Sequence, residues 1–174
     1  MRALFRTAAT IGSGLALVAA AGCGQGMGGG EAPPQQPDAL ASLDACSILT
    51  PDQATAAGVK PQGAPDTQFS SEPGCAYRGS DVDVTTYKNM TTTVEAETGK
   101  PVYARFDKVD VNGRSGAVTV AQGSTRARIC STMFDAGKGM VRVSVRTKHP
   151  GDNSFCEKSQ EVAKQIEPRM PKKQ

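Results

Sequence analysis

The sequence contains no tryptophan and only 5% aromatic residues, so a folded core must consist mainly of aliphatic side chains. It has one histidine, His149, in 174 residues. The GxSxG, SxxK, HExxH and P-loop patterns, which position nucleophiles, zinc ligands or phosphates, are all missing. No CxxC pair is present either, which weakens a zinc interpretation of the cysteines. We therefore expect no metal site, no cofactor and no enzymatic activity.

A strong excess of one charge is also missing. The formal net charge is +3, and two of the basic residues, Arg2 and Arg6, lie in the N-terminal segment. Without that segment the chain has 18 basic and 17 acidic residues. A nearly neutral domain lacks the general electrostatic attraction on which binding to nucleic acid depends. We expect no nucleic-acid partner.

The first 22 residues have the architecture of a secretory signal. Arg2 and Arg6 precede an apolar stretch over residues 8–21, and its 14 residues are fewer than the roughly 20 that span a bilayer as a helix. Small residues then lead into Cys23. This arrangement resembles a bacterial lipobox, whose cysteine is acylated and becomes the mature N-terminus. An ordinary signal cleaved near Ala21, or an uncleaved membrane anchor, is the alternative.

We expect residues 1–22 to be a lipoprotein signal peptide and Cys23 to carry palmitate-type acyl chains. These chains would anchor the protein to the cell membrane on its extracytoplasmic face, because two or three chains give stable attachment. Residues 23–43 then form an acylated cysteine followed by a flexible Gly/Pro-rich tether. Such a tether has an r.m.s. span of about 25 Å. Residues 44–174 remain for one extracytoplasmic domain.

Helix and strand signals in this domain predict an α+β fold. Thr50 and Gln53 form a capping box around Pro51, which starts a short helix. Residues 75–79 and 82–87 are typical of two strands joined by a turn. Asn112-Gly113 indicates a second hairpin, whereas residues 88–104 are compatible with either helix or loop.

Residues 126–148 give the clearest hairpin. A turn over residues 136–139 sets a register that pairs Asp135 with Met140, Phe134 with Val141, Thr132 with Val143 and Cys130 with Val145. Because strand side chains alternate, Cys130 should face the core and Arg142 and Arg146 the opposite side.

An amphipathic helix should follow this hairpin. Ser154 and Glu157 suggest a second capping box, and apolar residues recur at helical spacing at Phe155, Val162, Ala163 and Ile166. The predicted architecture is a mostly antiparallel sheet with a short N-terminal helix and a C-terminal helix packed on it.

Five cysteines is an odd number, and acylation of Cys23 would leave four. Four cysteines allow three disulfide connectivities in an oxidising compartment. We favour Cys46–Cys75, which would join the short helix to the first strand, and Cys130–Cys156, which would join the last helix to the sheet. Each bond closes a loop that is worth about 3 kcal/mol in the chain-entropy model.

The stretch LDACSILTPDQATAAGV resembles the start of an actinobacterial lipoprotein family catalogued as domain of unknown function 3558. That family opens on an Asp-x-Cys-x-Leu-Leu-Thr-like segment, which Asp44, Cys46, Leu49 and Thr50 match and from which Ile48 departs. GCAYRG matches the family's second cysteine strand, with Tyr77 where members often have tryptophan. Further blocks match in order: VNGRSGAV, ARICSTMFDAGKGMVRVSV and FCEKSQEVAKQIEPRMP.

The resemblance covers roughly residues 40–171 and implies surface lipoproteins with no established activity. The predicted architecture is also similar to the extracellular sensor domains of mycobacterial receptor kinases and to PsbP/Mog1-like sandwiches. This second likeness concerns the fold alone.

Three functions remain, of which a binding or sensing module for an unknown small molecule or protein is favoured. Its candidate binding face combines Ile129, Met133, Met140, Arg142 and Arg146, unless a segment such as residues 90–104 covers it. The alternative is an envelope protein that contacts cell-wall polymer, anionic lipid or a protein partner. Its basic residues would be Arg114, Lys138, Arg142, Arg146, Lys148 and the tail PRMPKKQ.

A hydrolase is the weakest hypothesis. A catalytic triad would have to use His149 beside a turn, where an imidazole is usually solvated. Asp81 and Asp83 could form a carboxylate pair, but they are more simply interpreted as the solvent-exposed side of a strand.

Overall fold

The computed structural model describes residues 39–152 and 154–173. The predicted signal peptide, Cys23 and residues 24–38 lie outside this part of the chain. Seven strands form one antiparallel sheet in the order β1-β2-β3-β7-β6-β5-β4. The strands are β1 (Ala64–Asp66), β2 (Gly74–Arg78), β3 (Val82–Asn89), β4 (Tyr103–Val111), β5 (Arg114–Ala121), β6 (Ile129–Ala136) and β7 (Gly139–Thr147).

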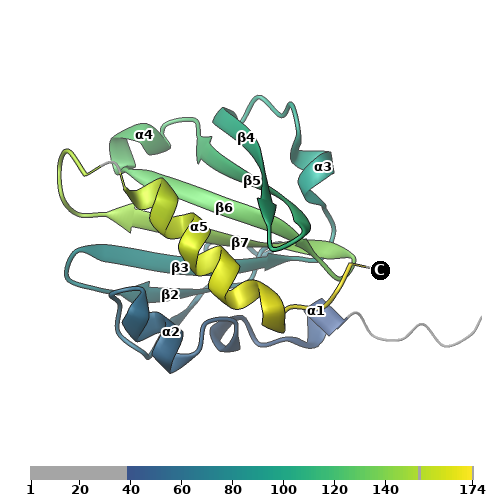
Figure 1. The fold of residues 1–174 in the computed structure, drawn as a ribbon, viewed down its shortest axis with the longest axis horizontal. Coiled ribbons are helices and arrows are strands. Elements are labelled where there is room, and N and C mark those ends of the chain that lie inside the picture. Colours follow the sequence, from purple (N-terminus) through teal and green to yellow (C-terminus); the bar gives the residue numbers. More distant parts are fainter. Residues whose placement is uncertain (1–38, 153, 174) are drawn as a thin grey trace, which may run out of the picture. The chain divides into compact units, whose positions relative to one another are not determined.

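Helices lie on both sides of this sheet, and the main one is α5 (Phe155–Ile166), which crosses one face (Figure 1). The other helices are short: α1 (Ala39–Ser42), η1 (Ala45–Ser47), α2 (Pro51–Ala56), α3 (Val94–Glu97), α4 (Ser124–Ala127) and η2 (Glu167–Arg169). No helix in the described part of the chain is long and apolar enough to cross a membrane. The predicted α+β fold is confirmed.

Strand β7 occupies the middle of the sheet because the chain leaves β3, forms β4 at the far edge and returns strand by strand. Its valines at 141, 143 and 145 are fully buried, and they belong to the same core cluster as Val162, Ala163 and Ile166 of α5. The predicted register of β6 and β7 is confirmed at every pair, including Cys130 opposite Val145. Cys130 is buried on the α5 side, as expected.

Two disulfides fix the helical segments to the sheet. Cys46 bonds to Cys75 and Cys130 bonds to Cys156, with Cα–Cα distances of 4.9 and 5.0 Å. The favoured connectivity is therefore confirmed. The first bond joins η1 to β2, and the second joins the first turn of α5 to β6.

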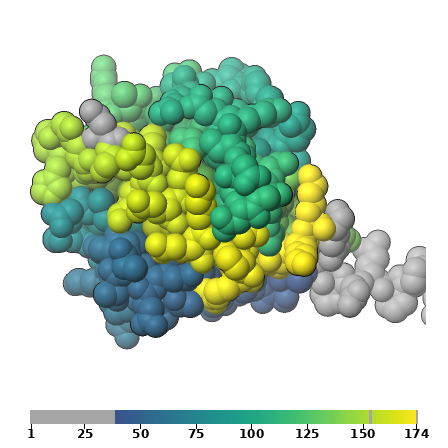
Figure 2. All heavy atoms as spheres, in the orientation of Figure 1, coloured from purple at the N-terminus to yellow at the C-terminus, as the bar shows by residue number. Residues whose placement is uncertain are grey.

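Side chains from both flanks hold the carboxyl end of α5. Gln53 Nε2 donates to the Gln165 carbonyl at 2.8 Å, and Asn112 Nδ2 donates to the Lys164 carbonyl at 2.9 Å. These carbonyls would otherwise lack partners, because the last turn of a helix has no further N–H groups to pair with them. In Figure 2, α5 lies between the blue segment that contains α2 and the teal β4–β5 hairpin.

Residues 39–43 belong to the folded unit, so the expected domain boundary at residue 44 is too late. Leu40 is fully buried in the main core cluster, and Leu43 packs against that cluster. Lys88 of β3 holds the segment: its ammonium group donates to the carbonyls of Leu40, Ala41 and Leu43. Lys88 is only 7% exposed, and these three acceptors replace the water that a buried ammonium group loses.

Of the two predicted capping boxes, the one at Thr50 is confirmed and the one at Ser154 is wrong. Thr50 and Gln53 make both reciprocal hydrogen bonds of the box at the start of α2. Ser154 does not cap α5, because its N–H and its hydroxyl both donate to Asp152 Oδ1 instead. The carboxylate of Asp152, two residues earlier in the chain, therefore binds the serine in place of the helix N-terminus.

Residues 88–104, for which the sequence left helix and loop open, contain both a short helix and loop. Thr93 accepts from the Ala96 N–H and starts α3, while Asp135 of β6 accepts from the Val94 N–H at 2.9 Å. Loop residues flank this single helical turn. The aspartate that fixes the turn lies far along the chain, so a local pattern could not reveal it.

We predict that Lys88→Met lowers the free energy of unfolding by about 2 kcal/mol, because three carbonyls lose a charged donor while the aliphatic stem remains. Denaturant unfolding measures this loss, and hydrogen exchange should accelerate over residues 39–48. Lys108→Met is the matched control, since Lys108 makes an exposed ion pair with Glu95 and its loss should cost less than about 0.5 kcal/mol. Equal effects of the two substitutions would contradict the prediction.

Candidate functional site

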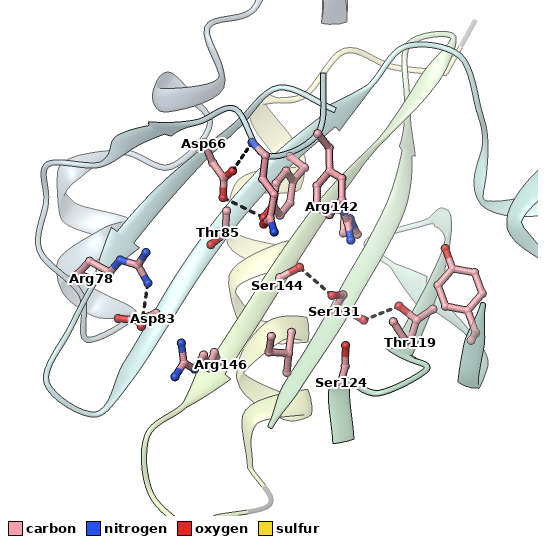
Figure 3. A pocket seen from close by; sticks show the side chains of 16 residues that line it. Asp66, Arg78, Asp83, Thr85, Thr119, Ser124, Ser131, Arg142, Ser144 and Arg146 are labelled. Atoms are coloured by element: carbon pink, nitrogen blue, oxygen red, sulfur yellow. Dashed lines mark hydrogen bonds and ion pairs between the residues drawn. The ribbon is translucent and has the colours of Figure 1, made fainter. Parts of the chain in front are cut away.

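A pocket of about 450 Å³ opens on the face of the sheet opposite α5 (Figure 3). Its floor is a row of hydroxyl side chains on four neighbouring strands. Strand register places Thr85 opposite Ser144, Ser144 opposite Ser131, and Ser131 opposite Thr119. The Ser131 and Ser144 hydroxyls are 2.7 Å apart and share a hydrogen bond. Because strands lie ~4.8 Å apart, the row is about 14 Å long.

Aromatic rings form part of the pocket wall. Phe69, from the loop after β1, meets Tyr87 edge-on with ring centroids 6.3 Å apart, and Tyr103 stands at the β4 side. Tyr87 donates its hydroxyl to Asp66 at 3.1 Å, and Tyr103 donates to Glu97 at 2.7 Å. Burial and the neighbouring carboxylates raise the pKa of both tyrosines. Both hydroxyls therefore stay protonated, which fixes the rings.

Arg142 lies beside the hydroxyl row and is held in place by two groups. Its guanidinium carbon is 4.4 Å from the centroid of the Tyr87 ring, and its Nη2 donates to Glu72. The buried Nε has no hydrogen-bond partner within the described residues. Stacking on the ring and pairing with one carboxylate orient the group and offset its charge.

The other side of the row is more positive. Asp83 is 6% exposed and binds two cations: Arg78 Nη1 at 3.1 Å and Lys148 Nζ at 3.0 Å. Burial raises the pKa of Asp83, but the hydrogen bonds from Lys148 and Arg78 outweigh this effect and the net shift is downward. Arg146 lies directly opposite Asp83 in the register. With Arg146 included, three cations surround one carboxylate.

All five residues of the predicted binding face share one side of the β6–β7 hairpin, but they divide into two groups. Ile129, Arg142 and Arg146 line the pocket. Met133 and Met140 are 0% and 2% exposed and pack under Val94 of α3. The segment 90–104 therefore covers the methionines, and only the other three can contact a ligand.

The basic residues of the envelope hypothesis are largely engaged within the fold. Arg114 pairs with Glu167 at a buried position and donates to the Met170 carbonyl at 2.8 Å, so it fixes the chain that follows α5. In the C-terminal tail, Lys173 pairs with Asp135 at 2.7 Å. Lys148 binds Asp83, whereas Lys138 is exposed in the β6–β7 turn.

The only histidine is not arranged as a catalytic base. His149 Nε2 lies 2.6 Å from Asp81 Oδ1, and Ser80 donates its hydroxyl to the other oxygen of Asp81. A serine nucleophile must instead donate to the imidazole. The expected exposed pair of aspartates is also wrong, because Asp83 is buried. Within residues 39–152 and 154–173, no group of three His, Cys, Asp or Glu side chains could hold a metal ion.

The hydroxyl floor was missed, although part of its signal is local. Ser144 stands between Arg142 and Arg146 on the same face of β7, and Ser131 follows Ile129 in the same way on β6. The alternation that placed the arginines also places these serines. Thr85, Tyr87 and Phe69 join the site through pairing of distant strands and loops, which no local pattern encodes.

We predict that Glu97→Gln lowers stability by about 1–2 kcal/mol at pH 7 and by progressively less as the pH falls below 4.5. Glu97 is buried and accepts from Lys100, Tyr103 and Thr92. Burial raises its pKa, but these donors outweigh that effect and lower the pKa below its ordinary 4.5. Its contribution is thus complete above pH 4.5 and disappears as the pH falls through the folded-state pKa.

Denaturant unfolding at pH 7 and at a series of pH values below 4.5 measures this difference, with Glu161→Gln on the exposed side of α5 as control. The wild-type protein should lose more stability on acidification than the Glu97→Gln variant. If the free energies of unfolding of the two proteins fall equally on acidification, Glu97 does not stabilise the Tyr103 side of the pocket.

A family model described as "Protein of unknown function (DUF3558)" matches residues 18–169. No curated protein and no solved structure matches the chain significantly. The match includes the two disulfides, the hydroxyl floor and both arginines beside it. The chain belongs to the DUF3558 family of proteins of unknown function, as its cysteine-containing blocks led us to expect.

Proposed function

We propose that this protein is a non-enzymatic binding module that is anchored by acyl chains on Cys23 and binds a small molecule in the sheet-face pocket. The observation that carries the proposal is the pocket itself. Its volume of about 450 Å³ falls within the ~300–1,000 Å³ typical of small-molecule sites. Its walls combine aromatic, hydroxyl and cationic side chains that a ligand can contact together.

Binding is favoured over catalysis by the chemistry of the lining. The pocket contains serine and threonine hydroxyls but no histidine, and its lining carboxylates are engaged. Asp66 accepts from Tyr87, and Asp83 is bound by Arg78 and Lys148. No described side chain is therefore poised to activate one of these hydroxyls as a nucleophile.

The membrane anchor is the second part of the proposal. It rests on the signal-like segment before Cys23 and on the two disulfides, which suit an oxidising extracytoplasmic compartment. The disulfides alone do not distinguish an anchored protein from a secreted one. As part of the same proposal, we place the protein among actinobacterial lipoproteins and expect its fold to resemble that of kinase sensor domains.

The alternative function, charge-based contact with envelope polymer or anionic lipid, has less support. Arg114, Lys148 and Lys173 neutralise carboxylates of the domain itself. Ion-paired side chains attract an external polyanion less than unpaired ones do. A protein partner remains compatible with the pocket rim, where Phe69 is 46% exposed.

We predict that Cys23→Ser releases the protein from the membrane, because the acyl chains supply the anchor. Cell fractionation in the native host should find the wild-type protein in membranes and the variant in the soluble extracytoplasmic fraction. Mass spectrometry should identify acylated Cys23 as the first residue of the wild-type protein. Gln25→Ser, which introduces serine two positions after Cys23 and leaves both disulfides intact, should leave attachment unchanged. An unmodified wild-type N-terminus would refute the anchor.

We predict that Ser144→Phe abolishes ligand retention, since a phenyl ring from the floor occupies the pocket. Native mass spectrometry of the full chain, purified in detergent from its host, should show an added mass on the wild-type protein that denaturation removes. Glu161→Phe makes the same substitution on exposed α5 and should keep the ligand. Circular dichroism checks that both variants fold.

If the wild-type protein retains nothing, a small-molecule extract of the host is titrated against it, and the backbone amides of Ser131, Ser144 and Arg146 are followed by NMR. Shifts that Ser144→Phe removes would support the pocket. No retained mass together with no amide shift would contradict the proposed function.

A further inference from the structure

The pocket floor has the chemistry of a site for hydroxyl-rich molecules. Thr85, Ser144, Ser131 and Thr119 contribute a hydroxyl from each of four adjacent strands. Each hydroxyl can donate one hydrogen bond and accept others, as sugar hydroxyls do. Ser131 and Ser144 share one hydrogen bond, and Thr119 donates to the Ser131 carbonyl, but each hydroxyl keeps further acceptor capacity. A hydrocarbon chain on this floor would remove that capacity from water without a new partner, which is costly. The floor therefore favours a polyhydroxylated ligand over an acyl chain.

An unpaired cation stands at one side of this floor. Arg146 and Asp83 are direct partners across β3 and β7, where an ion pair would be expected. Both oxygens of Asp83 are already bound, Oδ2 by Arg78 and Oδ1 by Lys148. Arg146 is exposed and has no ion pair among the described residues. Its guanidinium group is available to an anion.

Arg142, on the opposite side of the floor, has a different role. It pairs with Glu72 and stacks on Tyr87, so its charge is already offset. The two arginines are four residues apart on one strand, which separates their Cα atoms by about 13 Å. A ligand that spans this distance meets an aromatic wall at one end and an unpaired cation at the other.

From this asymmetry we infer that the pocket binds an anionic saccharide, meaning a sugar that carries a phosphate or carboxylate group. The anionic group lies at Arg146, the sugar hydroxyls bond to the Ser131–Ser144 row, and the ring packs toward Phe69 and Tyr103. This inference rests on the proposed binding function and specifies its ligand class. Aromatic rings suit the apolar faces of sugars, and a guanidinium fork matches both anions.

The test uses the full chain in detergent and four probes: glucose 1-phosphate, glucuronate, glucose and inorganic phosphate. NMR titration of the pocket amides yields a dissociation constant for each. We expect at least one of the two anionic sugars to bind about tenfold more tightly than glucose or phosphate, because only it engages both the floor and Arg146. Comparison of the first two probes identifies the anionic group.

Arg146→Gln should weaken the preferred anionic sugar about tenfold and leave the weak binding of glucose unchanged. Arg126→Gln removes an exposed arginine of α4 that does not line the pocket, and it should change neither. Ser131→Ala should weaken both sugars, since each uses the floor.

Three results would overturn the inference. One is binding of phosphate as tight as that of the anionic sugars, which would indicate a simple anion site. The second is an unchanged affinity in Arg146→Gln. The third is pocket shifts with host extract but with neither anionic sugar, which leaves the proposed binding function intact while rejecting this ligand class. If no probe and no extract shifts the pocket amides, the proposed function fails as well.

Discussion

The alternation of side chains along β7 is the constraint on which the rest of the structure depends. This strand is the middle one of seven, and its valines at 141, 143 and 145 form the surface on which α5 packs. The same period of two forces Arg142, Ser144 and Arg146 to the opposite face. A register shift of one residue would exchange core and pocket, so burial of the valines also fixes the site.

Competition for a single carboxylate then determines the electrostatics of that site. Asp83 lies between three cations, and its two oxygens bind Arg78 and Lys148. Both partners come from positions beside the β2–β3 turn, where Lys148 also donates to the Gly79 carbonyl at 2.6 Å. Arg146 is excluded although it faces Asp83 directly. The positive character at this end of the pocket arises because three cations share one carboxylate, and the way the pairs form leaves Arg146 as the cation without an ion pair among the described residues.

Sequence reasoning succeeded where the determinants were local or periodic. The β6–β7 register and the Thr50 cap followed from short spacings. The disulfide pairs, 29 and 26 residues apart, were favoured because each would join a predicted helix to a predicted strand. It failed at Ser154, where a nearby aspartate competed for the expected cap, and at residue 44, because the buried Leu40 lies in an otherwise Gly/Pro/Ala-rich region. Alternation correctly placed the five residues of the candidate face on one side of the hairpin, but it could not separate Met133 from Arg142. That separation depends on α3, which an aspartate of β6 positions from 41 residues away.

The floor and the rim of the pocket differ in how firmly the fold holds them. The floor belongs to central strands whose other face is packed against α5, which a disulfide and flanking side chains hold at both ends. Side chains on such strands keep their positions and can discriminate between ligands. Phe69, by contrast, comes from a loop and remains 46% exposed despite its contact with Tyr87. The rigid part of the pocket is therefore its polar floor, whereas the aromatic rim at Phe69 depends on a loop and on a single ring contact.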